Sequence, residues 1–208
     1  MLLPVEPTRF AVFVGVMSGL AATPGPANLF SIATGIHKGP RAVLLGVLGM
    51  NAATLVWFVA AAVGLGALVA AFPQVFRLLT YAGAAYLVWL AFKSIRAAWR
   101  GDAGSGALVE REGGPLGQGF AVQIANPKAI LFFSAVLPPF LDLQRPIAPQ
   151  LVLFAIATIS LDVITMTTYG LGGVALAARM NSPGFRRLFN LFVGLILGLA
   201  ALLIVTRH

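Results

Sequence analysis

The stretch LAATPGPANLFS, residues 20–31, sets two prolines and one glycine inside an otherwise apolar run. Pro24, Gly25 and Pro26 interrupt any helix that contains them, because proline lacks a backbone N–H and glycine is a poor helix former. The residues on both sides nevertheless have the composition of a helix that crosses a membrane. We therefore predict a membrane helix that stops and restarts near its middle.

The composition of the whole chain is that of a membrane protein. Of its 208 residues, 59% are hydrophobic and 10% are charged, whereas soluble domains are about 45–50% apolar and about 25% charged. Long stretches with no more than one charged residue have room for six helices of about 20 residues each. We predict an all-α polytopic membrane protein with six spans, at residues 8–34, 41–69, 73–99, 116–140, 147–178 and 184–206.

The net charge of +8 is interpreted as membrane orientation, not as a nucleic-acid surface, because the basic residues are spread over short loops. With six spans, nine of the 14 basic residues fall on one side: Lys38, Arg41, Lys93, Arg96, Arg100, Arg111, Arg179, Arg186 and Arg187. Four fall on the other side: Arg9, Arg77, Arg145 and Arg207. The positive-inside rule places the first set in the cytoplasm, so both termini are predicted to lie outside it.

The chain divides into two halves of three spans each. A Gly-rich, charged segment at residues 100–115 is predicted to be a cytoplasmic linker between repeats at 1–99 and 116–208, which form one membrane domain. GLA at residues 19–21 resembles GFA at 119–121, and a proline follows each motif. Because three is an odd number of spans, the second half is inverted relative to the first. Interrupted helices at corresponding positions of inverted repeats indicate a transporter binding site.

Asp162 is the only acidic residue deep within a predicted span. A carboxylate there costs about 2.5–3.5 kcal/mol on insertion scales and usually faces a cavity or a partner. Thr158, Thr165 and Tyr169 stand at i−4, i+3 and i+7 from Asp162, so these four residues form a polar seam along one helix face. Either Asp162 takes up and releases a proton, or it is a structural group paired with Lys128 or a hydroxyl.

The segment QIANPKAILFF, residues 123–133, contains the second break. Pro127 kinks its helix, and backbone opened at membrane depth lines a cavity or is buried in protein. The helix that restarts after Pro127 is expected to present free N–H groups, and Lys128 adds a positive charge. With Asn126 beside them, these groups suit a carboxylate. Alternatively, Lys128 reaches the membrane interface or only pairs with Asp162.

The first break is the expected counterpart of the second. Pro26 suits the first turn of a restarted helix, Gly25 permits close approach of the backbone, and Asn28 offers a donor and an acceptor. Together with Pro24 these residues are candidates for substrate binding. The alternative is a proline kink that only serves packing.

Other small and polar residues are expected to serve helix packing. Gly46 and Gly49 with Ala53, and Gly194 with Gly198, have the small-residue spacing of helix contacts. Asn51 and Thr54 are expected to form hydrogen bonds between helices and not to belong to the binding site. The sequence contains no Ser-His-Asp, P-loop or metal-ligand pattern, so neither an enzyme activity nor a metal nor a cofactor is predicted.

Four features of the sequence resemble the LysE/RhtB family of amino-acid exporters. They are TPGPANLF at 23–30, YAGAAYLVWLAFKSIR at 81–96, GFAVQIANPKAILFFSAVLPPF at 119–140 and the acid Asp162. The resemblance extends over residues 8–206. It assigns the matching positions, both proline breaks with Asn126, Lys128 and Asp162, to the transport site. The family usually has Asn or Asp directly after Pro-Gly-Pro, where this chain has Ala27.

The resemblance implies a secondary transporter of a bacterial inner membrane, driven by the proton gradient. We expect its partners to be an amino acid, protons and the lipid bilayer, with a homodimer as the possible assembly and no nucleic acid. Small neutral amino acids of the homoserine, threonine or leucine kind are the expected substrates, because the spans offer a single carboxylate for a cationic side chain. The alternatives are an exporter of basic amino acids, a passive channel, or a membrane scaffold without transport.

Overall fold

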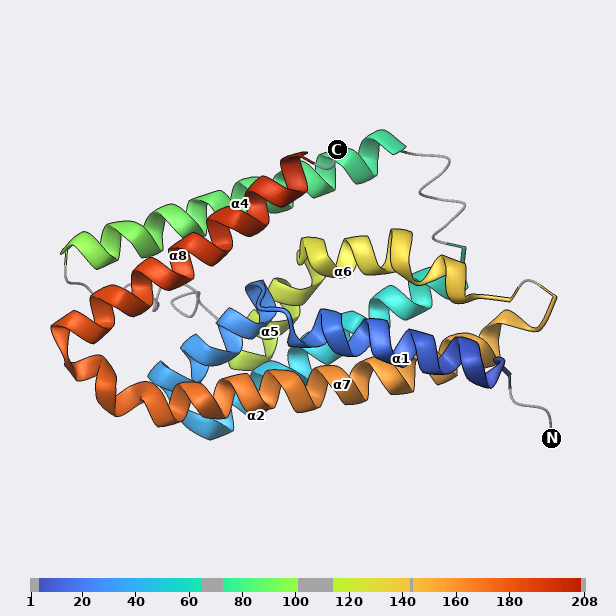
Figure 1. Ribbon diagram of the computed structural model, residues 1–208, viewed down its shortest axis with the longest axis horizontal. Helices are drawn as coiled ribbons and strands as arrows, with labels where there is room; N and C mark the ends of the chain where they lie inside the picture. Colours follow the sequence, from blue (N-terminus) through green and yellow to red (C-terminus); the bar gives the residue numbers. More distant parts are fainter. Residues whose placement is uncertain (1–3, 65–72, 101–113, 143, 207–208) are drawn as a thin grey trace.

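The computed structural model describes residues 4–64, 73–100, 114–142 and 144–206, and every regular element within these ranges is a helix (Figure 1). The elements are α1 (Pro7–Ala22), α2 (Pro26–Ala62), α4 (Pro73–Arg100), α5 (Pro115–Ile124), α6 (Pro127–Leu131), the π-helix η2 (Phe132–Val136), the 3₁₀-helix η3 (Pro138–Phe140), α7 (Ile147–Leu176), the 3₁₀-helix η4 (Ala177–Asn181) and α8 (Pro183–Thr206). The predicted linker at 100–115 lies almost entirely outside the described residues.

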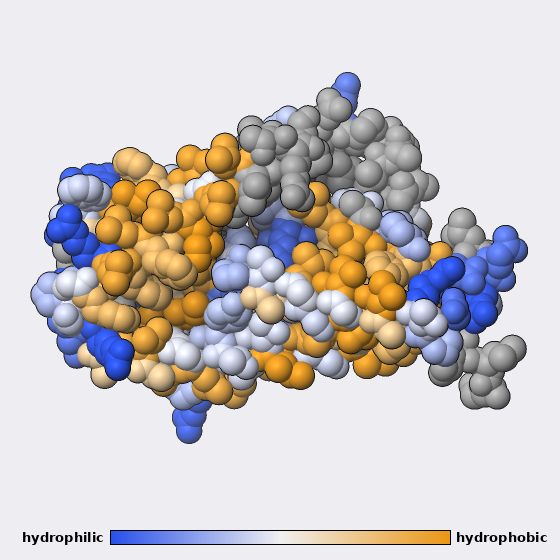
Figure 2. All heavy atoms as spheres, viewed as in Figure 1, coloured by the Kyte–Doolittle hydropathy of each residue, from blue (hydrophilic) through white to orange (hydrophobic). Residues whose placement is uncertain are grey.

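The helices carry the apolar surface of a multi-pass membrane protein. Among the described residues, α2 and the helix Ile147–Arg179 are each long and apolar enough to cross a bilayer, and α5 with residues Pro127–Phe140 would form a third span bent by 46°. Large apolar side chains such as Leu48 and Ile164 are exposed. Figure 2 shows apolar residues over much of one face, with hydrophilic residues gathered at its two ends. The number of six spans stays a prediction.

The predicted first break is present between α1 and α2. The N–H of Thr23 closes the last turn of α1 on the carbonyls of Gly19 and Leu20. Pro24 has no N–H with which to continue the helix. Gly25 precedes the restarted helix, and Pro26 occupies its first position, where the missing N–H has no cost.

Helix α2 comprises two helices joined by a sharp turn at Gly39. This residue has φ 79° and ψ −177°, a region that is almost restricted to glycine, and Pro40 begins the second helix. The sequence predicted a connection between residues 34 and 41. The observed connection is much shorter, because the first helix continues almost to Gly39. The second helix ends at Ala62, and the end predicted at residue 69 lies outside the described residues.

The span predicted at residues 116–140 is also broken. α5 ends at Ile124 and α6 begins at Pro127, which agrees with the break predicted there. The restarted helix then widens into the π-helix η2 and ends in η3. The π-helix was not predicted from the sequence.

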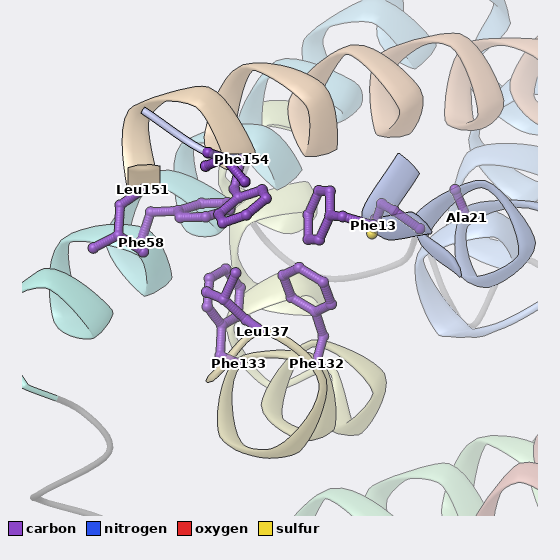
Figure 3. Packing of buried hydrophobic residues seen from close by; sticks show 10 residues of the cluster. Phe13, Ala21, Phe58, Phe132, Phe133, Leu137, Leu151 and Phe154 are labelled. Atoms are coloured by element: carbon purple, nitrogen blue, oxygen red, sulfur yellow. The ribbon is translucent and has the colours of Figure 1, made fainter. Parts of the chain in front are cut away.

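Aromatic side chains connect the two broken helices at one end of the bundle (Figure 3). The ring centroids of Phe13 and Phe154 lie 4.3 Å apart, those of Phe58 and Phe133 lie 4.8 Å apart, and those of Phe132 and Phe133 lie 4.9 Å apart. We call these five residues the aromatic cluster. It joins α1, the second part of α2, η2 and α7 into one buried core.

Glycines bring α2 into backbone contact with α5. A methyl group at Gly119 would overlap the carbonyl of Gly46, and one at Gly49 would overlap the carbonyl of Leu116. The predicted packing role of Gly46 and Gly49 is thus confirmed. The absence of side chains at these positions lets the two helix backbones touch.

Glycines also join the first part of α2 to α7. A methyl group at Gly173 would overlap the carbonyl of Ile32, and one at Gly35 would overlap the carbonyl of Gly170. The main chain of the first part of α2 is therefore held closely against α7, and that of the second part against α5.

The predicted third and sixth spans, α4 and α8, pack against each other and lie together along one side of the other helices (Figure 1). A methyl group at Gly194 would come 2.6 Å from the side chain of Ile95, and one at Gly198 would only touch Ala91 at 4.0 Å. Gly194 therefore makes the close contact expected of it, and Gly198 makes a looser one.

Candidate functional site

A cavity lies where the two broken helices meet α7. It measures about 40 Å³, and its wall comprises Met17, Leu20, Gly25, Ala27, Asn28, Thr54, Gln123, Asn126, Lys128, Ala129, Phe132, Phe133, Thr158, Asp162 and Met166. At roughly 10–15 Å³ per water molecule, this space suits about three waters. Six residues predicted as substrate-binding, proton-coupling or supporting side chains thus share one wall. Pro24, Pro26 and Pro127 form the breaks beside the cavity without lining it.

The break after α1 frees backbone carbonyls that side chains then bind. The last carbonyls of a helix have no partner within it. The amide nitrogen of Asn28 donates to the carbonyl of Ala21 at 3.1 Å and to that of Thr23 at 3.2 Å. Asn28 is buried, and its donors hold the restarted helix against the helix that precedes it.

Two further donors reach the same end of α1 from other helices. The Lys128 ammonium nitrogen lies 3.0 Å from the carbonyl oxygen of Thr23, and the Tyr169 hydroxyl lies 2.8 Å from the carbonyl oxygen of Ala22. Lys128 therefore crosses from the second break to the first. No hydrogen bond or ion pair joins Lys128 to Asp162 in the part of the chain that the structure describes, but both residues line the cavity and their opposite charges attract each other.

The second break is closed by its own polar residues. The side-chain oxygen of Asn126 accepts the N–H of Lys128 at 3.1 Å, so the start of α6 is capped. The expectation of free N–H groups at α6 is wrong for Lys128, because Asn126 satisfies that donor. The start of α2 has no side-chain cap, and the N–H groups of Ala27 and Asn28 belong to its first turn.

Asp162 is 6% exposed and lines the cavity. Its carboxylate makes no hydrogen bond or ion pair with any residue in the described ranges. The hydroxyl of Thr158, one turn away, is buried and has no partner within the same ranges. A carboxylate buried in this way requires a proton or a cationic partner.

The polar seam of α7 is divided along its length. Thr158 and Asp162 line the cavity, whereas Thr165 and Tyr169 line a separate hollow of about 450 Å³. The hydrogen bond from Tyr169 places the end of α1 across the seam. The predicted helix face is present, and its two halves line different hollows.

Sequence reasoning missed one polar residue of the wall and assigned another to packing. Gln123 lies one turn before Asn126 and is buried, and its amide nitrogen lies 3.1 Å from the hydroxyl oxygen of Thr54. The available signal was a glutamine and an asparagine at i and i+3 within an apolar run. Thr54 is indeed bonded between helices, as predicted, and it also lines the cavity.

Comparisons with known proteins place these features in a family. The family model described as LysE type translocator matches residues 18–208. The chain is 31% identical over 190 residues to the homoserine/homoserine lactone efflux protein of Salmonella typhimurium, which covers 91% of this chain and 92% of that protein.

Two more distant matches are also named as efflux proteins. The leucine efflux protein of Klebsiella pneumoniae is 32% identical over 68% of this chain and 66% of its own length. The threonine efflux protein of Escherichia coli K12 is 29% identical over 57% of this chain and 59% of its own length. No solved structure matches the chain. With its two proline breaks and a family match over most of its length, the chain belongs to the LysE type translocator family.

Proposed function

We propose that the chain exports small neutral amino acids from the cytoplasm by proton antiport. The observation that carries this proposal is the buried carboxylate of Asp162, which forms no hydrogen bond or salt bridge with the described residues, in a cavity bounded by two broken helices. The efflux relatives named for homoserine, leucine and threonine support the substrate class. In the proposed orientation, the chain spans the inner membrane with both termini outside the cytoplasm.

The cavity offers a different partner to each end of an amino acid. Asp162 is the group for the ammonium. The start of α2, with the N–H groups of Ala27 and Asn28 uncapped by any side chain, is the group for the carboxylate. Apolar side chains such as Met17, Phe132 and Met166 form much of the remaining wall. A neutral side chain suits this wall, because the described residues of the cavity contain a single carboxylate.

Proton coupling follows from competition at Asp162. The carboxylate binds either a substrate ammonium or a proton, because both neutralise the same buried charge. Export would carry the ammonium outward on Asp162 and return the carboxylate protonated. Such a cycle moves the amino acid outward and the proton inward, as antiport requires.

The size of the cavity supports alternating access. Space for about three waters is too small for leucine, so substrate entry requires the walls to separate. The aromatic cluster closes the cavity toward the start of α1, which the proposed orientation places outside. The described conformation is then closed toward that side.

The decisive experiment uses the purified full-length chain in proteoliposomes with an imposed pH gradient. Counterflow of labelled homoserine, threonine, leucine, lysine and arginine identifies the substrate. Uphill movement that stops when the pH gradient collapses supports antiport. Purely downhill flux would indicate a channel, and flux of lysine and arginine alone would indicate an exporter of basic amino acids. Either result, or no flux of any amino acid, would refute the proposal.

The role of Asp162 is tested separately with Asp162→Asn. We expect this variant to lose uphill transport, and Asp162→Glu to retain part of it. Asp142→Asn is the matched control, because Asp142 lies in the turn before α7, paired with Arg145 at 3.4 Å. Full coupling in Asp162→Asn would remove Asp162 from the mechanism and leave amino-acid export standing.

A further inference from the structure

Four consecutive hydrogen bonds connect α2 to the second break. The N–H of Lys128 donates to Asn126, and the Asn126 amide donates to Gln123 at 3.0 Å. The Gln123 amide donates to the Thr54 hydroxyl, which lies 3.3 Å from the carbonyl of Met50. We propose that Gln123 and Thr54 are positioning residues that fix α6, and with it Lys128, in the substrate cavity. The inference rests on the proposed function of that cavity.

The relay, defined as Thr54, Gln123 and Asn126, has only one possible direction. The backbone N–H of Lys128 can only donate and the carbonyl of Met50 can only accept. Each amide between them must therefore accept with its oxygen and donate with its nitrogen. A chain of donors that all point the same way strengthens each bond through mutual polarisation. The Lys128 N–H therefore sets the orientation of the Asn126 side chain, and the bonds through Gln123 to Thr54 hold the side chain in that orientation.

Glycine contacts hold the relay at the correct spacing. Gly119 lies four residues before Gln123, and Gly46 lies two helical turns before Thr54, so each glycine shares a helix face with a relay residue. Gly119 and Gly46 touch through their backbones. Because the helices cannot separate at that point without losing this contact, the Gln123 amide stays within reach of the Thr54 hydroxyl.

The relay residues are buried. Thr54 is 1% exposed, Asn126 is 4% exposed and Gln123 is 5% exposed. A buried amide that loses its partner costs more than a surface amide, since no bulk water replaces the bond. Removal of the Thr54 hydroxyl is therefore expected to disturb Gln123 and Asn126, and through them the start of α6.

The relay also connects one break to the other. Its last member caps the N–H of Lys128, and the ammonium of the same residue binds the carbonyl of Thr23 at the end of α1. Loss of the relay would free α6 to turn and would displace the Lys128 ammonium. A substrate would then meet a less ordered wall, which raises KM before it lowers the maximal rate.

The transport test compares Thr54→Val with Thr54→Ser. Valine keeps the shape of threonine and removes the hydroxyl, so we expect KM to rise about tenfold, the loss expected for one buried hydrogen bond, with Vmax within about twofold. Serine retains the hydroxyl and should restore KM. Thr168→Val is the matched control, because the Thr168 hydroxyl donates only to Ile164 of its own helix and should leave KM unchanged.

A double-mutant cycle tests whether Gln123 and Thr54 act through the same bond. Gln123→Met alone should raise KM at least as much as Thr54→Val does, because it removes the bonds to both Thr54 and Asn126. The double variant should show the larger single effect and not the product of the two, since both changes remove one shared interaction. Multiplication of the two effects, or unchanged KM in Thr54→Val, would overturn the relay.

A second measurement does not depend on transport. The chain contains no cysteine, so Ala129→Cys introduces a single thiol into the cavity wall beside Lys128. We expect a small thiol reagent to label this cysteine severalfold faster in a Thr54→Val background and at an unchanged rate in a Thr168→Val background. Faster labelling without transport would refute the proposed function and support the relay. Equal labelling in both backgrounds would refute the relay even if transport is intact.

Discussion

Adjacent glycines in α7 provide a direct test of the backbone contact between α7 and α2. A methyl group at Gly173 would overlap the carbonyl of Ile32, whereas one at Gly172 meets nothing within 4 Å. Gly173→Ala should therefore lower the free energy of unfolding by about 1–3 kcal/mol, the usual cost of overpacking. The overlapped atoms are backbone, so no side-chain rotation can relieve the overlap.

Gly172→Ala is the control and has the opposite expected sign. Replacement of glycine by alanine in a compatible helix stabilises by about 0.4–1 kcal/mol, chiefly by restricting the unfolded chain. In a bilayer separated helices remain helical, so this gain is an upper limit here. The two variants should differ by at least about 1 kcal/mol, although they add the same methyl group one residue apart.

The assay is unfolding by sodium dodecyl sulfate in mixed micelles, followed by circular dichroism and extrapolated to zero denaturant. We expect Gly173→Ala to unfold at a lower detergent fraction than the unmodified chain, and Gly172→Ala at an equal or higher one. Equal midpoints for the two variants would refute the close backbone contact. Such a result would also remove the basis for treating α2 and α7 as one rigid unit.

Three further changes have separate expected outcomes. Gly39→Ala should lower the free energy of unfolding in the same detergent titration by roughly 1–3 kcal/mol, because φ of 79° is strained for alanine; unchanged stability would contradict the turn. Tyr169→Phe should speed amide hydrogen exchange at the end of α1 by about 2- to 12-fold, which corresponds to the free energy of the lost hydrogen bond to Ala22. An exchange rate equal to that of the unmodified chain would show that this bond does not stabilise the end of α1. Gln150→Leu removes four hydrogen bonds around the turn before α7, and should cost about 1–3 kcal/mol of unfolding free energy without changing KM; a raised KM would place Gln150 in the transport mechanism.

Helix positions and both breaks were predictable because they depend on local chemistry. An apolar run of suitable length predicts a helix in lipid, and Pro24, Pro26 and Pro127 lack the N–H that a continuous helix needs. The burial of Asp162 was predictable for the same reason, since a carboxylate in an apolar helix avoids lipid. The packing of Gly46 followed from small-residue spacing alone.

Features that depend on which helices meet could not be predicted from the sequence. Helical periodicity correctly gave the angular position of Tyr169 but could not show that the end of α1 crosses its face. The partner of Gln123 lies 69 residues away on α2, and no local pattern indicates that pairing. The capping of Lys128 by Asn126 is by contrast local, and an asparagine before the restarted helix was the available signal; the free N–H expected at Lys128 was therefore wrong.

The glycine contacts of α2 restrict how the chain can move during a transport cycle. At each glycine the missing side chain leaves space that a neighbouring backbone occupies. The next equivalent position along a helix is one turn, about 5.4 Å, away. A slide of less than one turn would press a side chain into main-chain atoms at Gly35, Gly46 or Gly119. These contacts therefore oppose axial sliding of the first part of α2 against α7 and of its second part against α5. The remaining freedom is tilt of the short helix α6 and of α1, which meet their neighbours through hydrogen bonds and aromatic rings that can re-form at a new angle.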